Sequence, residues 1–278
     1  MSKRRGEPRG AYEWIVQAAV WLGITLTMGV LVYLLVHILW NGIPFVTADL
    51  FAYKYNTSNV SLFPALITTI YLTVGTLLLA IPLGVGTAVY MTEYAQRDSW
   101  LVKWVRMASE TLAGIPSIVY GLFGFLFFVI FLQLGYSLIS GVLTMTILVL
   151  PFVIKTTEEA LLTVPTGLRE GSYGLGVGKR DTILKIILPV AGRGIVAGII
   201  LAIGRIVGET VALMYTIGTV PEIPGNLMQS GRTMAIHMYA LSSEGIHTDK
   251  AYATGVILIV VVVLMNEISS LVMNKWRK

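Results

Sequence analysis

The stretch that decides the fold is PTGLREGSYGLGVGKRDTILKIILP, residues 165–189. It is the longest polar interruption between strongly apolar segments that also has a structured pattern. Two short amphipathic pieces, Leu168–Leu175 and Thr182–Leu188, flank a glycine-rich joint. Gly176 predicts a tight turn there, because glycine reaches backbone angles that other residues avoid. Pro189 is expected to end the second piece, since proline cannot donate the next helical hydrogen bond.

Composition places this segment in a membrane protein. Of the 278 residues, 55% are hydrophobic and only 13% are charged, whereas soluble domains carry about 25% charged residues. The chain has no cysteine, and its three histidines lack ligand-like spacing, so we expect no disulfide, no metal site and no cofactor. It also lacks a Gly-x-x-x-x-Gly-Lys-Ser/Thr phosphate loop, which excludes ATP hydrolysis by the chain itself.

Six apolar stretches are expected to cross the membrane as helices, since one span needs about 20 apolar residues. They are residues Trp14–Trp40, Pro64–Tyr90, Met107–Leu132, Leu138–Ile154, Gly194–Ile217 and Ala253–Val272. The predicted fold class is therefore an all-α polytopic membrane protein. In the third stretch, Pro116 should interrupt regular hydrogen bonding, with Ser117 available to satisfy the freed backbone groups. The charged residues Glu93–Arg106 are expected to form a cytoplasmic connection before that stretch.

Positive charge is distributed unevenly between the two sides that six spans define. Of the 20 lysines and arginines, 16 fall on the side of the termini, 3 fall on the opposite side, and Arg205 lies inside a span. Because cytoplasmic loops carry an excess of Lys and Arg, both termini and residues 165–189 are predicted to be cytoplasmic. The net charge of +5 then reports topology in a lipid membrane, and we expect no nucleic-acid partner.

Glycine pairs on the fifth predicted span favour close helix packing. Gly194 with Gly198, and Gly204 with Gly208, have the small-xxx-small spacing that lets helix backbones approach each other in lipid. The contact could lie within this chain or with a second membrane subunit.

Five positions of residues 165–189 match a known spacing: Glu170, Gly176, Ile186, Leu188 and Pro189. They resemble the cytoplasmic EAA loop of ABC-importer membrane subunits, with small residues other than alanine after the glutamate. The resemblance implies a type I importer permease of MetI-like architecture, in which this loop docks as a coupling helix on a cytosolic ATPase subunit. An ordinary surface loop between two membrane helices is the alternative.

The resemblance also assigns roles and divides the chain. It implies that the ATPase-coupling residues are Arg169, Glu170, Gly171, Gly176 and Pro189. Residues 1–60 would form a basic N-terminal segment, the first span and an outer loop. Residues 61–274 would form a five-helix permease core with its coupling loop at 158–189, and residues 275–278 a basic cytoplasmic tail.

A second feature is a pair of ionisable residues in the fifth predicted span. Arg205 lies twelve residues after Arg193, about 18 Å along a helix and deep in a hydrocarbon layer of about 30 Å. An arginine at that depth costs roughly 2.5–3.5 kcal/mol. Glu209, four residues later, would project from the same helix face. The pair is either an anion site, with Ser117 and Thr210 along the same path, or a structural ion pair.

The motif GRIVGET at residues 204–210 resembles the phosphate-specific branch of ABC importers, as do GIPSIVYGLFG at 114–124 and Leu-Arg-Glu at 168–170. The resemblance implies inorganic phosphate as cargo, a second phosphate-permease membrane subunit, two cytosolic ATPase subunits and an extracytoplasmic phosphate-binding protein. The chain is most like the A-type subunit, although Val211 and Ala212 depart from the A-type pattern. A C-type subunit, or a permease for sulfate or molybdate, is the alternative.

The chemistry of the pair supports an oxyanion independently. Arginine presents a planar fork of donors that suits phosphate oxygens, and an ionised glutamate only accepts hydrogen bonds. Phosphate near neutral pH still carries a proton that it can donate to Glu209, whereas sulfate carries none. Two other classes of function are an intramembrane enzyme and a membrane scaffold or receptor. The chain has no Gly-x-Ser-x-Gly motif and no paired aspartates that would favour the enzyme.

Overall fold

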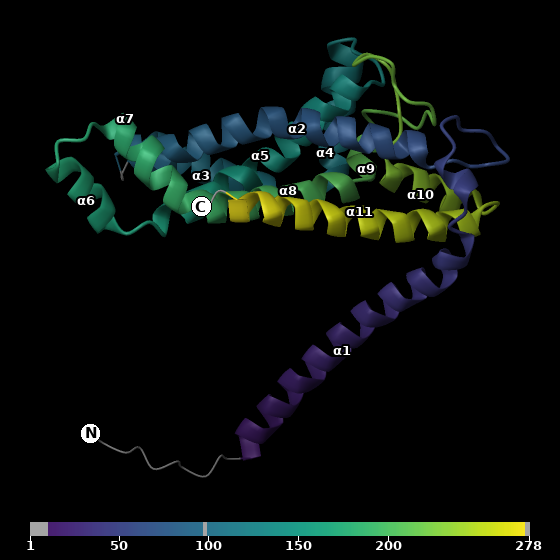
Figure 1. Cartoon of the computed structure of the whole chain (residues 1–278), viewed down its shortest axis with the longest axis horizontal. Coiled ribbons are helices and arrows are strands. Elements are labelled where there is room, and N and C mark those ends of the chain that lie inside the picture. Colours follow the sequence, from purple (N-terminus) through teal and green to yellow (C-terminus); the bar gives the residue numbers. More distant parts are fainter. Residues whose placement is uncertain (1–10, 97–98, 276–278) are drawn as a thin grey trace.

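The computed structural model describes residues 11–96 and 99–275, and within these ranges the regular secondary structure is entirely helical (Figure 1). Residues 1–10 and 276–278, which hold most of the predicted basic ends, lie outside the described residues. The longer helices are α1 (Ala11–Gly42), α2 (Phe63–Val89), α3 (Trp100–Ala113), α4 (Ser117–Gly124), α5 (Leu138–Leu162), α6 (Thr166–Gly174), α8 (Leu188–Gly208), α10 (Met234–Glu244) and α11 (Thr248–Lys275). The shorter elements are α7 (Lys179–Thr182), α9 (Val211–Met214), two 3₁₀ turns (Ile43–Phe45, Ala48–Phe51) and three π-helical segments (Tyr90–Tyr94, Phe125–Phe131, Ile183–Ile187).

Helix α5 is the central helix of the bundle and packs against α2 and α8. Its most apolar stretch is 67% buried, whereas no other long helix exceeds 33%. The Ser137 hydroxyl begins the helix by accepting a hydrogen bond from the Ser140 amide. The surrounding core is apolar and comprises Leu72, Ala80, Tyr120, Leu138, Val142, Met145, Leu148, Val149, Ile206, Ala212, Leu213, Ile217 and Ile236.

Two of the four glycines in the predicted pairs pack within this chain. A Cβ atom at Gly194 would collide with Ala160, and one at Gly198 with Thr156, both on α5. The first glycine pair therefore brings α8 close to α5. Gly204 and Gly208 have nothing near their Cβ positions, so the second pair makes no such contact within the described chain.

Five helices are long and apolar enough to cross a membrane, and a sixth span is counted if the bent pair α3–α4 is taken as one. The bend between α3 and the α4 segment is 102°, and it lies at Gly114–Pro116, where the sequence predicts an interruption. The backbone of Pro116 is extended (ψ 143°), since its ring removes a helical donor. The predicted count of six spans agrees with the larger of these two numbers.

Three predicted boundaries are wrong. Residues Glu93–Arg106 are not a loop, because α3 already begins at Trp100. Pro189 does not end a helix: the chain is helical on both sides of it, from Lys179 to Gly208, and the donor that proline lacks falls where a π-helical segment meets α8. The π-helical segment Ile183–Ile187 runs directly into α8, so the fifth span begins well before Gly194.

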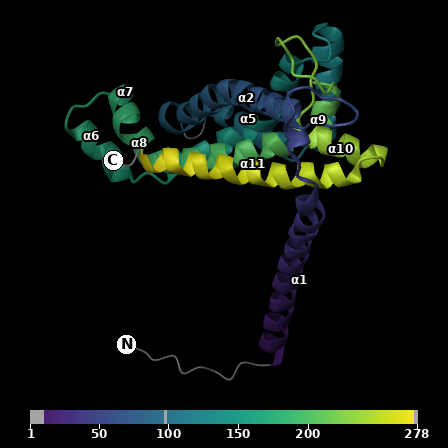
Figure 2. The same cartoon turned by 45° about the vertical axis from the view of Figure 1, so that its right-hand side comes forward.

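Helix α1 stands away from the bundle (Figures 1 and 2). None of its most apolar stretch is buried. It meets the body only at its C-terminal end, where Gly42 lies against Tyr252 and Val256 of α11 and the His37 ring packs edge-on to Tyr252. Its long apolar surface therefore has no covering partner among the described residues.

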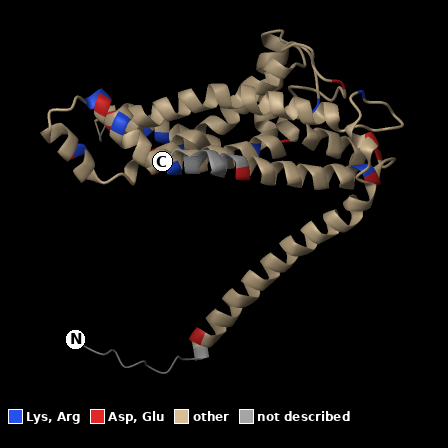
Figure 3. Ribbon diagram, in the orientation of Figure 1, with Lys and Arg blue, Asp and Glu red and all other residues tan. Residues whose placement is uncertain are grey.

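Charged residues gather toward the two ends of the bundle, and most of α1 has none (Figure 3). One end carries α6 and α7 together with the C-terminus of α2 (Figure 1). The other carries α10 and the N-terminus of α2, which are joined by a hydrogen bond of 2.9 Å from the Met234 amide to Thr69 Oγ1. The apolar middle between two charged ends is the pattern of a protein that spans a membrane.

Candidate functional site

Helix α8 ends at Gly208, one residue before the glutamate of the predicted pair. Glu209 is extended (φ −72°, ψ 129°), and its Oε1 accepts a hydrogen bond of 3.1 Å from the Ala212 amide. The carboxylate thus serves the first turn of α9, whose amides have no acceptor within the helix. The prediction of one continuous helix from Gly194 to Ile217 is wrong, because this carboxylate stabilises a break in the backbone.

The break separates Arg205 from Glu209. On an unbroken helix the two side chains would share one face, but here Arg205 lies in the last turn of α8 and Glu209 lies beyond it. Within the described ranges no salt bridge joins them. The expected geometry of an (i, i+4) ion pair is therefore wrong.

Arg205 is close to α4 instead. Its positive charge acts on Tyr120, a buried residue of α4 whose hydroxyl donates to the Leu112 carbonyl at 2.8 Å. The Arg205 side chain is half-buried, and no residue in the described part of the chain accepts a hydrogen bond from its guanidinium. A half-buried cation without an acceptor is available to a passing anion.

Two interrupted helices meet beside Arg205. Helix α4 starts directly after the 102° bend, and α9 starts directly after Glu209. Gly121 permits their close approach, because a Cβ atom there would lie 2.8 Å from the Ala212 Cα. Irregular backbone at membrane depth is tolerated where it is buried in protein or lines a water-filled cavity. The junction of α4, α8 and α9 is therefore the candidate path for a solute.

Ser117 and Thr210 each lie at one of these two breaks. Ser117 is the first residue of α4, Thr210 precedes α9, and both are half-buried. The Thr210 hydroxyl makes only a long contact of 3.5 Å to the Gly208 carbonyl. Neither residue is hydrogen-bonded to Arg205 or Glu209 in the part of the chain that the structure describes, so their place at the path rests on the backbone alone.

The predicted coupling segment forms a compact helical hairpin at one end of the bundle (Figure 1). Gly176 has φ +78°, which confirms the predicted tight turn between its two pieces. Ser172 and Thr182, both buried, share a hydrogen bond of 2.8 Å that closes the hairpin. The turn and the hydrogen bond together fix α6 against α7.

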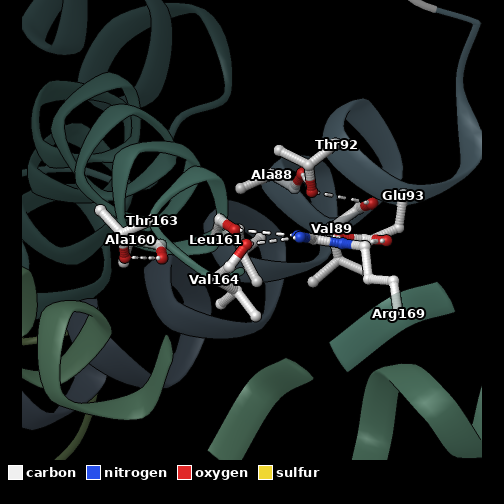
Figure 4. Close-up of polar contacts among 9 residues, drawn as sticks. All are labelled: Ala88, Val89, Thr92, Glu93, Ala160, Leu161, Thr163, Val164 and Arg169. Carbon is white, nitrogen blue, oxygen red and sulfur yellow. Dashed lines mark hydrogen bonds and ion pairs between the residues drawn. The ribbon is translucent and has the colours of Figure 1, made fainter. Parts of the chain in front are cut away.

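Arg169 fastens this hairpin to the body (Figure 4). Its Nη2 donates to Glu93 Oε1 at 2.8 Å, and its Nε donates to the same carboxylate at 3.1 Å. Nη2 and Nη1 also donate to the carbonyls of Leu161 and Val164 at 2.9 and 2.7 Å. These two carbonyls lie in the last turn of α5 and just after its end, so α6 is tied to both α2 and α5.

A second contact joins the hairpin to the same end of α2. The ammonium of Lys179 lies 4.8 Å from the centre of the Tyr94 ring, within the range of a cation–π interaction. Tyr94 and Glu93 both belong to the π-helical segment Tyr90–Tyr94. That segment therefore holds α6 and α7 at once.

The outer side of the hairpin is exposed. Glu170 and Gly171 face solvent, and three apolar side chains of the same hairpin are also exposed: Leu168 (41%), Tyr173 (43%) and Leu175 (85%). Apolar groups beside a charged residue on a projecting element are typical of a docking surface. Four of the predicted coupling residues lie in or next to this hairpin, and Pro189 follows it at the start of α8.

Sequence reasoning missed Glu93. It is the first residue of the predicted charged connection, and a single glutamate after a span belongs to no recognisable motif. The signal in the sequence is Arg169, because an arginine beside a predicted helix needs a hydrogen-bond acceptor. The sequence alone could not show that the end of α2 supplies it.

Comparisons with known proteins agree with this arrangement. A family model described as "binding-protein-dependent transport system inner membrane component" matches residues 80–276. The "Probable ABC transporter permease protein YqgI" of Bacillus subtilis is 36% identical over 217 residues, which are 72% of this chain and 74% of that protein. The "Phosphate transport system permease protein PstA 2" of Mycobacterium bovis is 31% identical over 266 residues, 93% of this chain and 88% of its own.

Solved structures share the fold. The chain of a bacterial alginate ABC transporter in complex with its periplasmic protein superposes with a TM-score of 0.68 at 16% identity, covering 93% of both chains. A chain of the inward-facing MetNI methionine ABC transporter superposes with a TM-score of 0.60 at 20% identity, covering 77% of this chain and 94% of its own. At these identities the likeness concerns the helical architecture.

Proposed function

Because this chain belongs to the family of binding-protein-dependent transport system inner membrane components, we propose that it carries inorganic phosphate into the cytoplasm as part of an ATP-driven importer. The chain is an ABC importer permease subunit of MetI-like fold. The observation that carries the choice of cargo is Arg205, a half-buried cation without an acceptor at the junction of two interrupted helices. A relative named as a phosphate permease that aligns with 93% of the chain supports it.

Arg205 and Glu209 act on the anion from the two sides of the helix break. The guanidinium offers paired donors to phosphate oxygens. Glu209 uses Oε1 to hold the Ala212 amide, and an ionised carboxylate keeps further acceptor sites for the proton that phosphate carries. Sulfate has no such proton and would meet an unpaired negative group, so Glu209 favours phosphate over sulfate.

The coupling hairpin receives the force of ATP hydrolysis from a cytosolic ATPase subunit. Its exposed Glu170, Gly171 and Leu175 form the contact surface. Arg169 passes the movement to α2 and α5, while the turn at Gly176 keeps the two pieces together. Pro189 begins the helix that ends just past Arg205, so the hairpin and the anion site are connected by one continuous helix.

A second, similar membrane subunit completes the path. Among the described residues, nothing covers most of the apolar length of α1, and this length is long enough to lie along a neighbouring bundle. We assign that surface to the partner permease subunit. By the predicted topology, α10 and the loops near it face outward and receive the phosphate-binding protein. The chain is more similar to the A-type subunit than to the C-type.

The test is uptake by the complete importer reconstituted in vesicles. Wild type should take up radiolabelled phosphate with ATP, and sulfate or molybdate much more slowly. Arg205→Gln should lower phosphate uptake at least tenfold, since hydrogen bonds to charged groups contribute about 1.5–3 kcal/mol. Arg193→Gln, an equal loss of charge at an exposed position of the same helix, is the control and should transport normally. Preferred uptake of sulfate or molybdate, or normal uptake by Arg205→Gln, would overturn the proposal.

A further inference from the structure

A second buried arginine lies at the opposite end of the bundle from the coupling hairpin. Arg232, directly before the residue that caps α10, is only 6% exposed. Its Nε and Nη2 atoms are buried and have no hydrogen-bond partner in the part of the chain that the structure describes. Among the residues that the structure describes, no carboxylate forms a salt bridge with it. Its guanidinium carbon lies 4.7 Å from the centre of the Tyr55 ring.

The two described side chains placed against Arg232, Tyr55 and His237, add no negative charge. The ring of Tyr55 also meets His237 edge-on, with centroids 6.2 Å apart, and His237 is fully buried. Burial and the neighbouring Arg232 charge lower the pKa of His237 to about 3, although the Val60 backbone acts in the opposite sense. The imidazole is therefore neutral near pH 7, and the cluster carries the single positive charge of Arg232.

Such an arrangement is costly unless something compensates the charge. Buried polar groups almost always have partners, and an exception in a native structure points to an unseen water or ion. Water would satisfy the two N–H groups but would leave the charge without a counter-ion. The paired, planar donors of arginine match the oxygens of an oxyanion.

We propose that Arg232 is an outer binding site for a small oxyanion, inorganic phosphate, which is held there before it reaches Arg205. This inference rests on the proposed function and on the topology that places α10 outside. The Tyr55 ring below the guanidinium and the neutral His237 form the walls of the site, and neither competes for the anion as a carboxylate would.

Entry to the site requires the loop of residues 52–62 to move. This loop carries Tyr55 over Arg232 and holds Val60 at φ +48°, a left-handed backbone that β-branched residues rarely adopt. A binding protein that docks on the outer surface is placed to trigger the movement.

The test measures phosphate binding to the assembled importer, purified without nucleotide, through the rise of its unfolding temperature with added phosphate. Arg205→Gln serves as the background, so that within this chain only the outer site can respond, and the other subunits contribute equally to every variant. Phosphate should still raise the unfolding temperature of Arg205→Gln, and chloride at the same concentration should raise it less. When Arg232→Gln is added to this background, the phosphate concentration that gives the same rise in unfolding temperature should increase at least tenfold. Lys54→Gln, which removes an exposed cation from the same loop, should leave it unchanged.

Arg232→Lys covers the case in which the glutamine variant fails to assemble. Lysine keeps the charge but loses the fork, so the phosphate requirement should rise several-fold. If either Arg232 variant needs the same phosphate concentration as the background for the same rise in unfolding temperature, the proposed site is wrong. So would an Arg232→Gln importer that binds phosphate normally but no longer docks its binding protein, because the partner of Arg232 would then be a carboxylate of that protein. If wild type transports sulfate or molybdate instead, the proposed cargo fails, and the same titration with that anion still tests Arg232.

Discussion

Arg169 on α6 grips Glu93 at the end of α2 through hydrogen bonds of 2.8 and 3.1 Å. Both side chains are largely buried, with 19% and 5% of their surfaces exposed. The same guanidinium donates to the carbonyls of Leu161, in the last turn of α5, and Val164, just after that helix. In the proposed importer, an ATPase that pushes on α6 would therefore act on two membrane helices through one side chain.

Arg169→Gln should uncouple the importer and destabilise it. Removing one partner of a buried ion pair strands the other and costs about 3–5 kcal/mol, so the unfolding temperature of the purified complex should fall by several degrees. The phosphate carried per ATP hydrolysed should fall as well, because α6 would move without α2. Both quantities can be measured on the same reconstituted sample.

The matched control is Lys185→Gln. It removes the exposed pair of Lys185 and Asp181, whose side chains are 72% and 51% exposed, and such pairs contribute at most about 1 kcal/mol. Glu93→Gln should reproduce the Arg169→Gln defect, and the double variant should be no worse than either single one. Strictly additive losses would show that the two residues act separately.

Gly176→Val should uncouple ATP hydrolysis from transport. The position has φ +78° and open space where a Cβ would lie, so the penalty is backbone strain alone, about 1–2 kcal/mol. Gly176→Asn should be tolerated far better, since asparagine enters the left-handed region more readily. Gly174→Ala, at a helical glycine with equal space, is the control. Normal coupling in Gly176→Val would rule out a role for this turn.

The architecture was predictable from the sequence because it depends on local chemistry. Long apolar stretches must form spans, the proline at 116 must interrupt one of them, and Gly176 signals its own turn. The break after Gly208 was not predictable, because Glu209 stabilises it through a backbone amide three residues later. Helical spacing treats that glutamate as a partner of Arg205 and gives no indication that it serves α9 instead.

Long-range partners account for the other differences. Glu93 and Arg169 are 76 residues apart, and no period or motif relates them. Arg232 and Tyr55 are likewise far apart in the sequence and meet only in the fold. Sequence patterns indicate which residues need a partner, whereas the fold determines which partner they meet.

The double variant Arg205→Ala with Glu209→Ala should fail to transport phosphate. Because no ion pair joins the two residues, their effects on the free energy of unfolding should add, and Glu209→Ala alone should cost about 1 kcal/mol by removing the acceptor for α9. Phosphate uptake and thermal unfolding should be measured for Arg205→Ala, Glu209→Ala and the double variant. Near-normal uptake by an assembled double variant would show that the two residues do not form the anion site.

Acid should destabilise the importer through His237. Its pKa is about 3 in the folded chain and about 6.5 when exposed. Below pH 6.5 the imidazole therefore binds a proton in the unfolded chain but stays neutral in the folded chain. The contribution of His237 is therefore complete above pH 6.5, and falls by about 1.4 kcal/mol per pH unit as the pH drops toward 3. Unfolding temperatures of the purified complex between pH 7.5 and 4.5 should fall more steeply for wild type than for His237→Gln. His247→Gln, just beyond the other end of α10, controls for the loss of a histidine and should keep the wild-type slope. Equal slopes for wild type and His237→Gln would show that the imidazole accepts a proton in the folded chain.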